Sequence, residues 1–253
     1  MRGETCSDFA DFAVDREALF REFLRPKNGV PSHDTFSRIF RLLGPAAFSA
    51  CFGRFLTDLG AAGAGAVAID GKTLRRSFDA AAGRSLLAVV TAFASATRAV
   101  IGQESFRSGA GASEILAARA LLRCLDLTGQ LVTADALHCQ AETAQLIRER
   151  GGDYLLRLKS NRPALHAAVA DYFAVPEVLA GLAGAESSDV EHGRIEVRRA
   201  HISHDLSWLT GPRSACADPA LLPGLACLGM IEATVTRNGK TTTTRHYHLS
   251  SRP

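Results

Sequence analysis

Apolar residues in the first sixty positions recur three and four residues apart, the spacing of one face of an α-helix. The pattern predicts a first helix ending near Leu24, before the Pro- and Gly-containing turn at 25–29. Ser32 is a typical N-cap for a second helix, and Gly44-Pro45 separates it from a third. Residues 1–60 are therefore expected to form a helical module.

The hydrophobic pattern changes at a Gly- and Ala-rich linker, residues 59–67, and a domain boundary is expected near residue 61. Three short apolar runs suit antiparallel strands, and after them helical and strand-like segments alternate, which favours parallel pairing. The expected elements are strands ending at 70 and spanning 86–94 and 99–104, a helix at 113–125, a strand at 131–134, a helix at 141–150 and a strand at 154–158.

The pattern loosens between 176 and 227, where only residues 193–202 alternate well enough to predict a strand. Two further strands, 228–236 and 242–250, flank an Asn-Gly pair that favours a hairpin turn. The prediction is a mixed α/β core at 61–253 with a β-rich insertion at about 176–227.

Composition narrows the class of protein. The hydrophobic content of 47% and charged content of 22% suit a folded globular chain, and the net charge of +3 permits nucleic-acid binding without requiring it. The six cysteines form no CxxC pair, so we expect reduced thiols and no zinc site. With no apolar stretch near the roughly 20 residues of a membrane span and no secretory signal, a cytoplasmic protein is expected.

Two aspartates follow predicted strands. Asp70 ends the first strand of the core, and Asp135 follows the strand at 131–134. If three antiparallel strands precede strand-helix-strand units, the first and fourth strands can lie side by side and bring both carboxylates to one edge, as in ribonuclease-H-like folds. Paired carboxylates there can hold Mg²⁺ and support phosphodiester hydrolysis or transesterification.

The simpler alternative is that each aspartate caps a turn after a strand, a common role for Asp. For either residue alone this interpretation is favoured. Because both follow apolar strands and precede small or polar residues, the pair favours metal binding.

Seven short segments occur in order along the chain: GVPSHDTF at 29–36, AIDGKTLR at 68–75, TADA at 133–136, GGDY at 151–154, LKSN at 158–161, HGRIE at 192–196 and RHY at 245–247. Together they resemble successive signatures of the H-repeat-associated insertion-sequence transposases, a bacterial family of the DDE superfamily. Agreement of several motifs in order is far more specific than any single one.

The resemblance implies a ribonuclease-H-like catalytic core that uses two Mg²⁺ or Mn²⁺ ions. Asp70 and Asp135 match the family's first two catalytic acids. Water would first be activated to cut at a transposon end, and the freed 3′ hydroxyl would then attack target DNA. The implied partners are double-stranded DNA and further copies of the chain.

The family's third acid lies on a later helix, in a segment resembling His-Trp-x-Ile-Glu-Asn. No such segment occurs here, so a truncated copy lacking the C-terminal catalytic helix is expected. Glu196 is an available carboxylate, although its motif matches the insertion. The family's Lys-Ser-Asn-Glu-Ile segment is replaced by Gly111-Ala112-Ser113-Glu114-Ile115, where Glu114 is explained by the helix dipole.

Basic residues cluster near both acids and could bind DNA phosphates with salt-sensitive affinity, although a solvated face is the simpler interpretation of any one. The candidates are Lys72, Arg75 and Arg76 after the first acid, Arg157, Lys159 and Arg162 after the second, and Arg194, Arg198 and Arg199 on the insertion. His138 and Cys139 are expected to pack or to form hydrogen bonds, because adjacent residues on a turn rarely share a metal.

Three functions remain open at this point. The first is a DDE transposase performing DNA transposition, truncated and of low or no activity. The second is a catalytically silent DNA-binding remnant that inhibits intact transposase. The third is a stand-alone ribonuclease-H-like nuclease. The helices of residues 1–60 could bind DNA or pack on the core.

Overall fold

The computed structural model describes residues 5–24, 27–44, 47–48, 51–52, 55, 65–74, 85–107, 113–191, 194–210 and 221–253. The chain divides into two compact units, Met1–Arg54 and Phe55–Pro253. The boundary expected at 60/61 lies outside the described residues.

The first unit contains the helices α1 (Cys6–Asp15), α2 (Glu17–Phe23) and α3 (His33–Leu42). The single helix expected up to Leu24 is two helices, because Arg16 leaves the helical conformation at φ −114° and ψ 16°. The predicted N-cap is confirmed, since the Ser32 hydroxyl accepts a hydrogen bond from the Thr35 backbone N–H at 3.4 Å. Most of the third expected helix lies outside the described residues.

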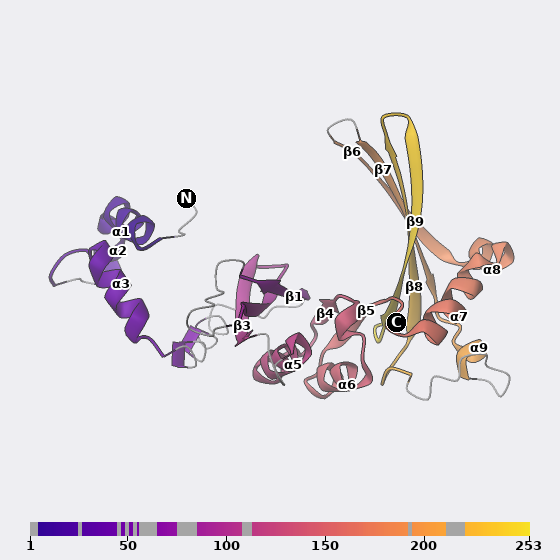
Figure 1. The fold of residues 1–253 in the computed structure, drawn as a ribbon, viewed down its shortest axis with the longest axis horizontal. Helices are drawn as coiled ribbons and strands as arrows, with labels where there is room; N and C mark the ends of the chain where they lie inside the picture. The colour runs from indigo at the N-terminus through magenta and orange to yellow at the C-terminus, as the bar shows by residue number, and fades with distance from the viewer. Residues whose placement is uncertain are drawn as a thin grey trace. The chain divides into compact units, whose positions relative to one another are not determined.

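The second unit is built on one sheet (Figure 1), in the order β3-β2-β1-β4-β5-β9-β8-β7-β6. β1 pairs in parallel with β4, and β4 with β5, while the other pairs are antiparallel. The strands are β1 (Ala66–Thr73), β2 (Leu87–Ala94), β3 (Ala99–Arg107), β4 (Leu131–Ala134), β5 (Asp153–Leu158), β6 (Ala183–Glu191), β7 (Arg194–Ser203), β8 (Cys227–Arg237) and β9 (Lys240–Ser250). The parallel pairing and the adjacency of the first and fourth strands are as predicted.

The helices of this unit are α5 (Glu114–Cys124), η1 (Ala136–His138), α6 (Ala141–Glu149), α7 (Pro163–Ala174), α8 (Pro176–Gly181) and α9 (Ser207–Thr210). None of α7, α8 and β6 was predicted. The sequence did not predict β6, because Ala183–Glu191 consists mostly of small and polar residues and shows no apolar alternation. β1 also continues past Asp70 to Thr73, where the sequence predicted its end.

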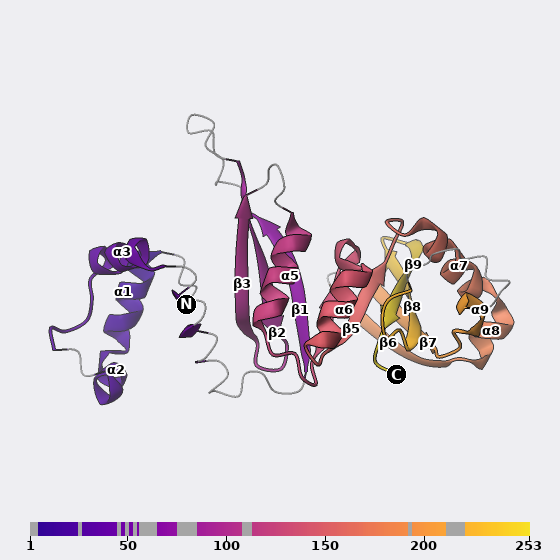
Figure 2. The same ribbon diagram turned by 90° about the horizontal axis from the view of Figure 1, so that it is seen from below.

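One face of the sheet is apolar and carries helices. Hydrogen-bonded register places six residues in one row across it: Gly102, Ala92, Ile69, Ala134, Leu156 and Leu249. The α5 residue Leu121 packs onto Gly102, and the α7 residue Phe173 stacks on Tyr247, two residues before Leu249. Figure 2 shows α5 lying along β2 and β3 and α6 beside β5.

The opposite face bears the neighbouring rows, which contain more polar residues. Asp70 pairs with Thr91 of β2, and Arg157 of β5 pairs with His248 of β9. Side chains alternate between the faces of a strand, so Asp70 and Arg157 lie on the face away from α5 and α7.

The first five strands in sheet order are therefore 3-2-1-4-5, with three antiparallel strands followed by two parallel ones. This is the ribonuclease-H-like arrangement expected for the mixed α/β core. The predicted hairpin between β8 and β9 is confirmed, with left-handed φ angles of 51° at Asn238 and 72° at Gly239. None of the described helices is long and apolar enough to cross a membrane.

Candidate active site at the sheet edge

Asp70 and Asp135 lie at the same edge of the sheet on neighbouring parallel strands. The last register pair of β1 and β4 joins Ile69 to Ala134. Asp70 directly follows Ile69, and Asp135 directly follows Ala134. Parallel neighbours lie about 4.8 Å apart, which brings the two backbone positions close together. The Asp70 side chain is 65% exposed, leaving its carboxylate accessible to a ligand.

Each carboxylate already has a partner. Asp70 Oδ2 lies 3.6 Å from Lys72 Nζ, and Asp135 Oδ1 accepts a hydrogen bond from the Leu137 backbone N–H at 2.9 Å. Asp135 is thus the N-cap of η1, so the turn-capping interpretation is correct for this residue. Because capping uses one carboxylate oxygen, it is compatible with a second role for the other.

The donor set of this edge suits a hard divalent cation, since Mg²⁺ and Mn²⁺ prefer carboxylate oxygen. Two carboxylates at adjacent strand ends are a minimal version of such a site. Within the described part of the chain, no group of three or more His, Cys, Asp or Glu side chains is placed to hold a metal.

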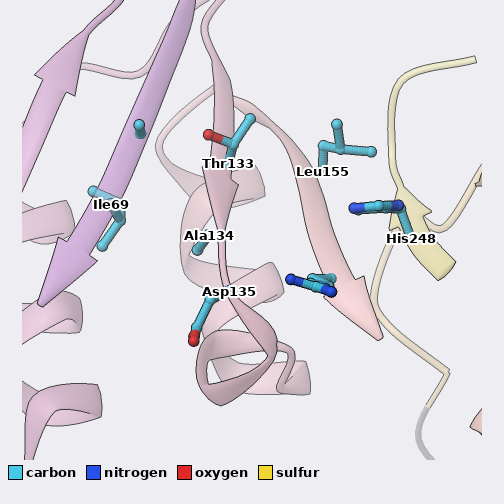
Figure 3. A pocket seen from close by; sticks show the side chains of 8 residues that line it. Ile69, Thr133, Ala134, Asp135, Leu155 and His248 are labelled. Carbon is cyan, nitrogen blue, oxygen red and sulfur yellow. The ribbon is translucent and has the colours of Figure 1, made fainter. Parts of the chain in front are cut away.

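An open pocket of about 280 Å³ lies beside Asp135 on the polar face (Figure 3). It crosses four strands, and Figure 3 shows Thr133, Leu155 and His248 on successive ones. The lining includes Ala68 of β1, Thr133 and Asp135 at the end of β4, Leu155 and Arg157 of β5 and His248 of β9.

The far side of this pocket from β1 is basic. Arg157 Nη2 lies 2.7 Å from His246 Nδ1, and the guanidinium serves there as the donor. Burial, followed by the charge of Arg157, lowers the pKa of His248 to about 4. Burial also lowers the pKa of His246, with smaller contributions from Arg157 and Lys159. Near neutral pH both imidazoles are therefore neutral beside two fixed cations.

The turn after Asp135 is fastened from two sides. Asn161, in the loop after β5, donates from Nδ2 to the Ala136 carbonyl at 2.6 Å. His138, only 2% exposed, lies 3.2 Å from Glu114 through its Nε2 atom. The expectation that His138 and Cys139 serve packing and hydrogen bonding agrees with the burial of both residues.

Comparison with known families now adds to this geometry. A family model described as Transposase DDE domain matches residues 61–217, and one described as DDE_Tnp_1-associated matches residues 2–56. The chain belongs to the DDE transposase family. Its relatives include the H repeat-associated transposases, as the ordered motifs indicated.

Two relatives show how far the similarity extends. A protein of Xanthobacter autotrophicus encoded in the dhlA 3′ region is 36% identical over 96% of this chain and 79% of its own length. The “H repeat-associated putative transposase YhhI” of Escherichia coli K12 is 34% identical over 77% of this chain. The alignment spans 52% of YhhI, about half that protein.

Among solved structures, the piggyBac transposase synaptic complex with hairpin DNA aligns with a TM-score of 0.35 and 12% identity. That alignment covers 87% of this chain and 44% of the other. The fold of this chain is assigned from its strand order.

The structure does not bring Glu196 to the two aspartates. Glu196 lies on β7, four strands beyond β4 in the sheet order, or roughly 19 Å at about 4.8 Å per strand. Its carboxylate is only 12% exposed and forms ion pairs with Arg194 and Arg198. In this structure Glu196 pairs with arginines of the insertion and is not brought to the two aspartates.

The basic residues separate into two groups. Arg194, Arg198 and Arg199 of β7 all pair with carboxylates of β6 or β7, which favours the simpler interpretation of a charged sheet surface. Arg162, at the start of α7, has a buried Nη1 atom turned away from solvent.

Lys72 and Lys159, in contrast, are exposed and lie near the candidate site. Arg75 and Arg76 lie outside the described residues.

Sequence reasoning missed the part of the site that β9 supplies. His246 and His248 come about 110 residues after Asp135 in the chain. Because β9 pairs with β5, His248 lines the pocket and His246 contacts Arg157. The alternation of His246 and His248 around buried Tyr247 was a usable signal, because it places both imidazoles on one face of the strand.

Proposed function

We propose that this chain is a DNA transposase of a bacterial insertion sequence, which cuts and joins DNA with a divalent metal held by Asp70 and Asp135. The observation that carries the proposal is the register of β1 and β4, which makes the two aspartates neighbours in a chain of the DDE transposase family. Transposon-end and target DNA are the proposed substrates, with more than one copy of the chain on the DNA.

Asp70 and Asp135 would hold Mg²⁺ or Mn²⁺, which supplies stabilisation of the attacking and leaving oxygens in phosphoryl transfer when bound. The Leu137 N–H fixes one oxygen of Asp135, so the other keeps a defined direction. Lys72, whose Nζ lies 3.6 Å from Asp70 Oδ2, would bind a DNA phosphate beside the carboxylates.

Arg157 and Lys159 are proposed to bind the DNA backbone beside the aspartates. Arg157 lines the same pocket as Asp135, and Lys159 is exposed at the end of the same strand. Among the described residues, neither Arg157 nor Lys159 pairs with a carboxylate, whereas the arginines of β7 do. A phosphodiester would supply the missing counter-charge.

A second candidate is a catalytically silent protein that binds DNA and competes with active transposase. One observation favours it, namely that no third carboxylate is placed to share a metal with the two aspartates among the residues the structure describes. In this alternative Lys72, Arg157 and Lys159 bind DNA while the aspartates serve the turn and the ion pair.

The deciding experiment incubates the purified chain and Mn²⁺ with a duplex carrying the DNA that borders its coding sequence. Nicking and joining products are measured for the chain and for the variants Asp70→Asn and Asp135→Asn. Asn also caps helical turns, so the second variant keeps η1 while losing the carboxylate. We expect both variants to lose activity at least about a hundredfold. Replacing a residue that only orients a metal ligand already costs about 10–100-fold, and these variants remove a ligand itself.

The outcomes separate the candidates. Binding without any cleavage supports the silent protein, and equal cleavage of an unrelated duplex supports a general nuclease. Cleavage that persists undiminished in both variants contradicts the proposal.

A further inference from the structure

The carboxylate of Glu114 lies against the backbone of Gly71, the residue directly after Asp70. A Cβ atom added to Gly71 would lie 2.3 Å from Glu114 Cδ and 2.4 Å from its Oε1. Cβ atoms do not approach other atoms this closely, so the carboxylate occupies the space that any side chain at position 71 needs. The absence of a side chain at Gly71 is what permits this contact.

The same carboxylate contacts the turn that Asp135 begins. Glu114 Oε1 lies 3.2 Å from Nε2 of His138, the last residue of η1. An ionised carboxylate only accepts hydrogen bonds, so the imidazole donates from Nε2. Glu114 therefore connects a residue one position after Asp70 with a residue three positions after Asp135.

This connection begins where the sheet stops joining the two segments. The ladder between β1 and β4 ends with the pair Ile69 and Ala134, one residue before the aspartates. β1 continues to Thr73, but beyond Ile69 it pairs only with β2 among the described residues. Among the described residues, Glu114 and His138 supply the next link between these two segments.

The helix dipole alone does not account for Glu114. Ser113 already caps α5, accepting a hydrogen bond from the Leu116 backbone N–H at 3.2 Å. Dipole stabilisation requires only an exposed charge in the first turn, whereas this side chain is 30% exposed and bonded to an imidazole that is 2% exposed. The Nδ1 atom of His138 is buried without a hydrogen-bond partner in the described structure. Burying an unpaired polar atom costs folding free energy, which indicates that the buried position of this imidazole serves a purpose.

We propose that Glu114 and His138 form a clasp that fixes the separation of the Asp70 and Asp135 carboxylates, which makes Glu114 a positioning residue for the metal site. The clasp rests on the proposed function. Gly71 faces the helical side of the sheet and Asp70 the other side, because successive strand residues alternate. Glu114 acts from behind the site, and groups that orient metal ligands set the affinity for the metal.

The test measures Mn²⁺ affinity by calorimetry and thermal unfolding of the full chain for Glu114→Ala, Glu114→Gln, Gly71→Ala and the double variant Gly71→Ala/Glu114→Ala. We expect Glu114→Ala and Gly71→Ala each to weaken Mn²⁺ binding about tenfold or more. Glu114→Gln should retain most of the affinity, because its amide can still bond to His138. In the Glu114→Ala background, Gly71→Ala should cost nothing further, since the space it needs is empty.

Gly229→Ala is the matched control, because Gly229 is also a strand glycine but its added Cβ meets only an ordinary contact at 3.6 Å. It should leave Mn²⁺ affinity unchanged. If Gly71→Ala and Glu114→Ala lower thermal stability but leave Mn²⁺ affinity intact while Asp70→Asn reduces it, the clasp is wrong and the metal site stands. If Asp70→Asn and Asp135→Asn do not change Mn²⁺ binding, the proposed function fails, and the positioning role fails with it.

Discussion

At the scale of single residues, the basic side of the pocket depends on histidines that stay neutral. Burial is the main reason for the low pKa of His248, and the neighbouring Arg157 and His246 lower it further. A group whose pKa is lower in the folded chain opposes folding once the solution is acidic enough to protonate it in the unfolded chain. The folded state therefore loses stability as pH falls below the ordinary value of 6.5, and the loss is complete below about pH 4.

This residue can be tested by replacing it with a neutral amide of similar shape. His248→Gln should flatten the decrease in unfolding free energy between pH 6.5 and about 4, as measured by urea denaturation across that range. His204→Gln is a suitable control, because the His204 imidazole is exposed to solvent. An unchanged pH profile in His248→Gln contradicts the assignment.

At the scale of elements, α5 packs on β2 and β3 and carries Glu114 at its first position. Its buried residues, including Leu121 and Leu122, face the sheet, and Leu121 fills the space above Gly102. Leu116, on the same helix, is 55% exposed. The position of Glu114 relative to the sheet edge thus depends on apolar packing a few turns away.

Leu121→Ala should lower the unfolding free energy by about 2–5 kcal/mol, because it leaves a cavity between the helix and β3. Leu116→Ala, at an exposed position of the same helix, should change it by less than about 0.5 kcal/mol. Chemical denaturation of the two variants measures both. Equal effects would mean that α5 does not pack on the sheet as described.

At the scale of the whole molecule, the arrangement of charge is more informative than the net charge of +3. Arginines of β7 are neutralised by neighbouring carboxylates, while Arg157 and Lys159 remain beside the aspartates. Binding of a DNA phosphate releases counterions, so each contact steepens the salt dependence of affinity by roughly 0.9 in a logarithmic plot.

Lys159→Gln and Arg157→Gln should each reduce that slope by about 1 on a short duplex, measured by fluorescence anisotropy from low to high salt. Arg194→Gln is the matched control, because Arg194 pairs with Glu196 on a distant strand. Its slope should not change. A larger effect from Arg194 than from Lys159 would place the DNA on the β6–β9 hairpins instead.

Most elements of the core could be predicted from the sequence, and Asp70 and Asp135 could be singled out as candidates. Both follow from apolar periodicity and turn residues, which act over a few neighbouring positions. The ends of β2 and β4, the Ser32 cap and the Asn238-Gly239 turn are local properties of this kind. Periodicity did not find β6, where small polar residues take strand form through pairing with β7.

Which distant residues lie together at the candidate site depends on the tertiary structure. Pairing of β9 with β5 brings His246 and His248 to Arg157, and packing of α5 brings Glu114 to Gly71 and His138. The same sheet order moves Glu196 away from Asp70 and Asp135. The physical reason is that strand order and helix packing are set by burial of apolar surface across the whole sheet, which no local stretch of sequence encodes.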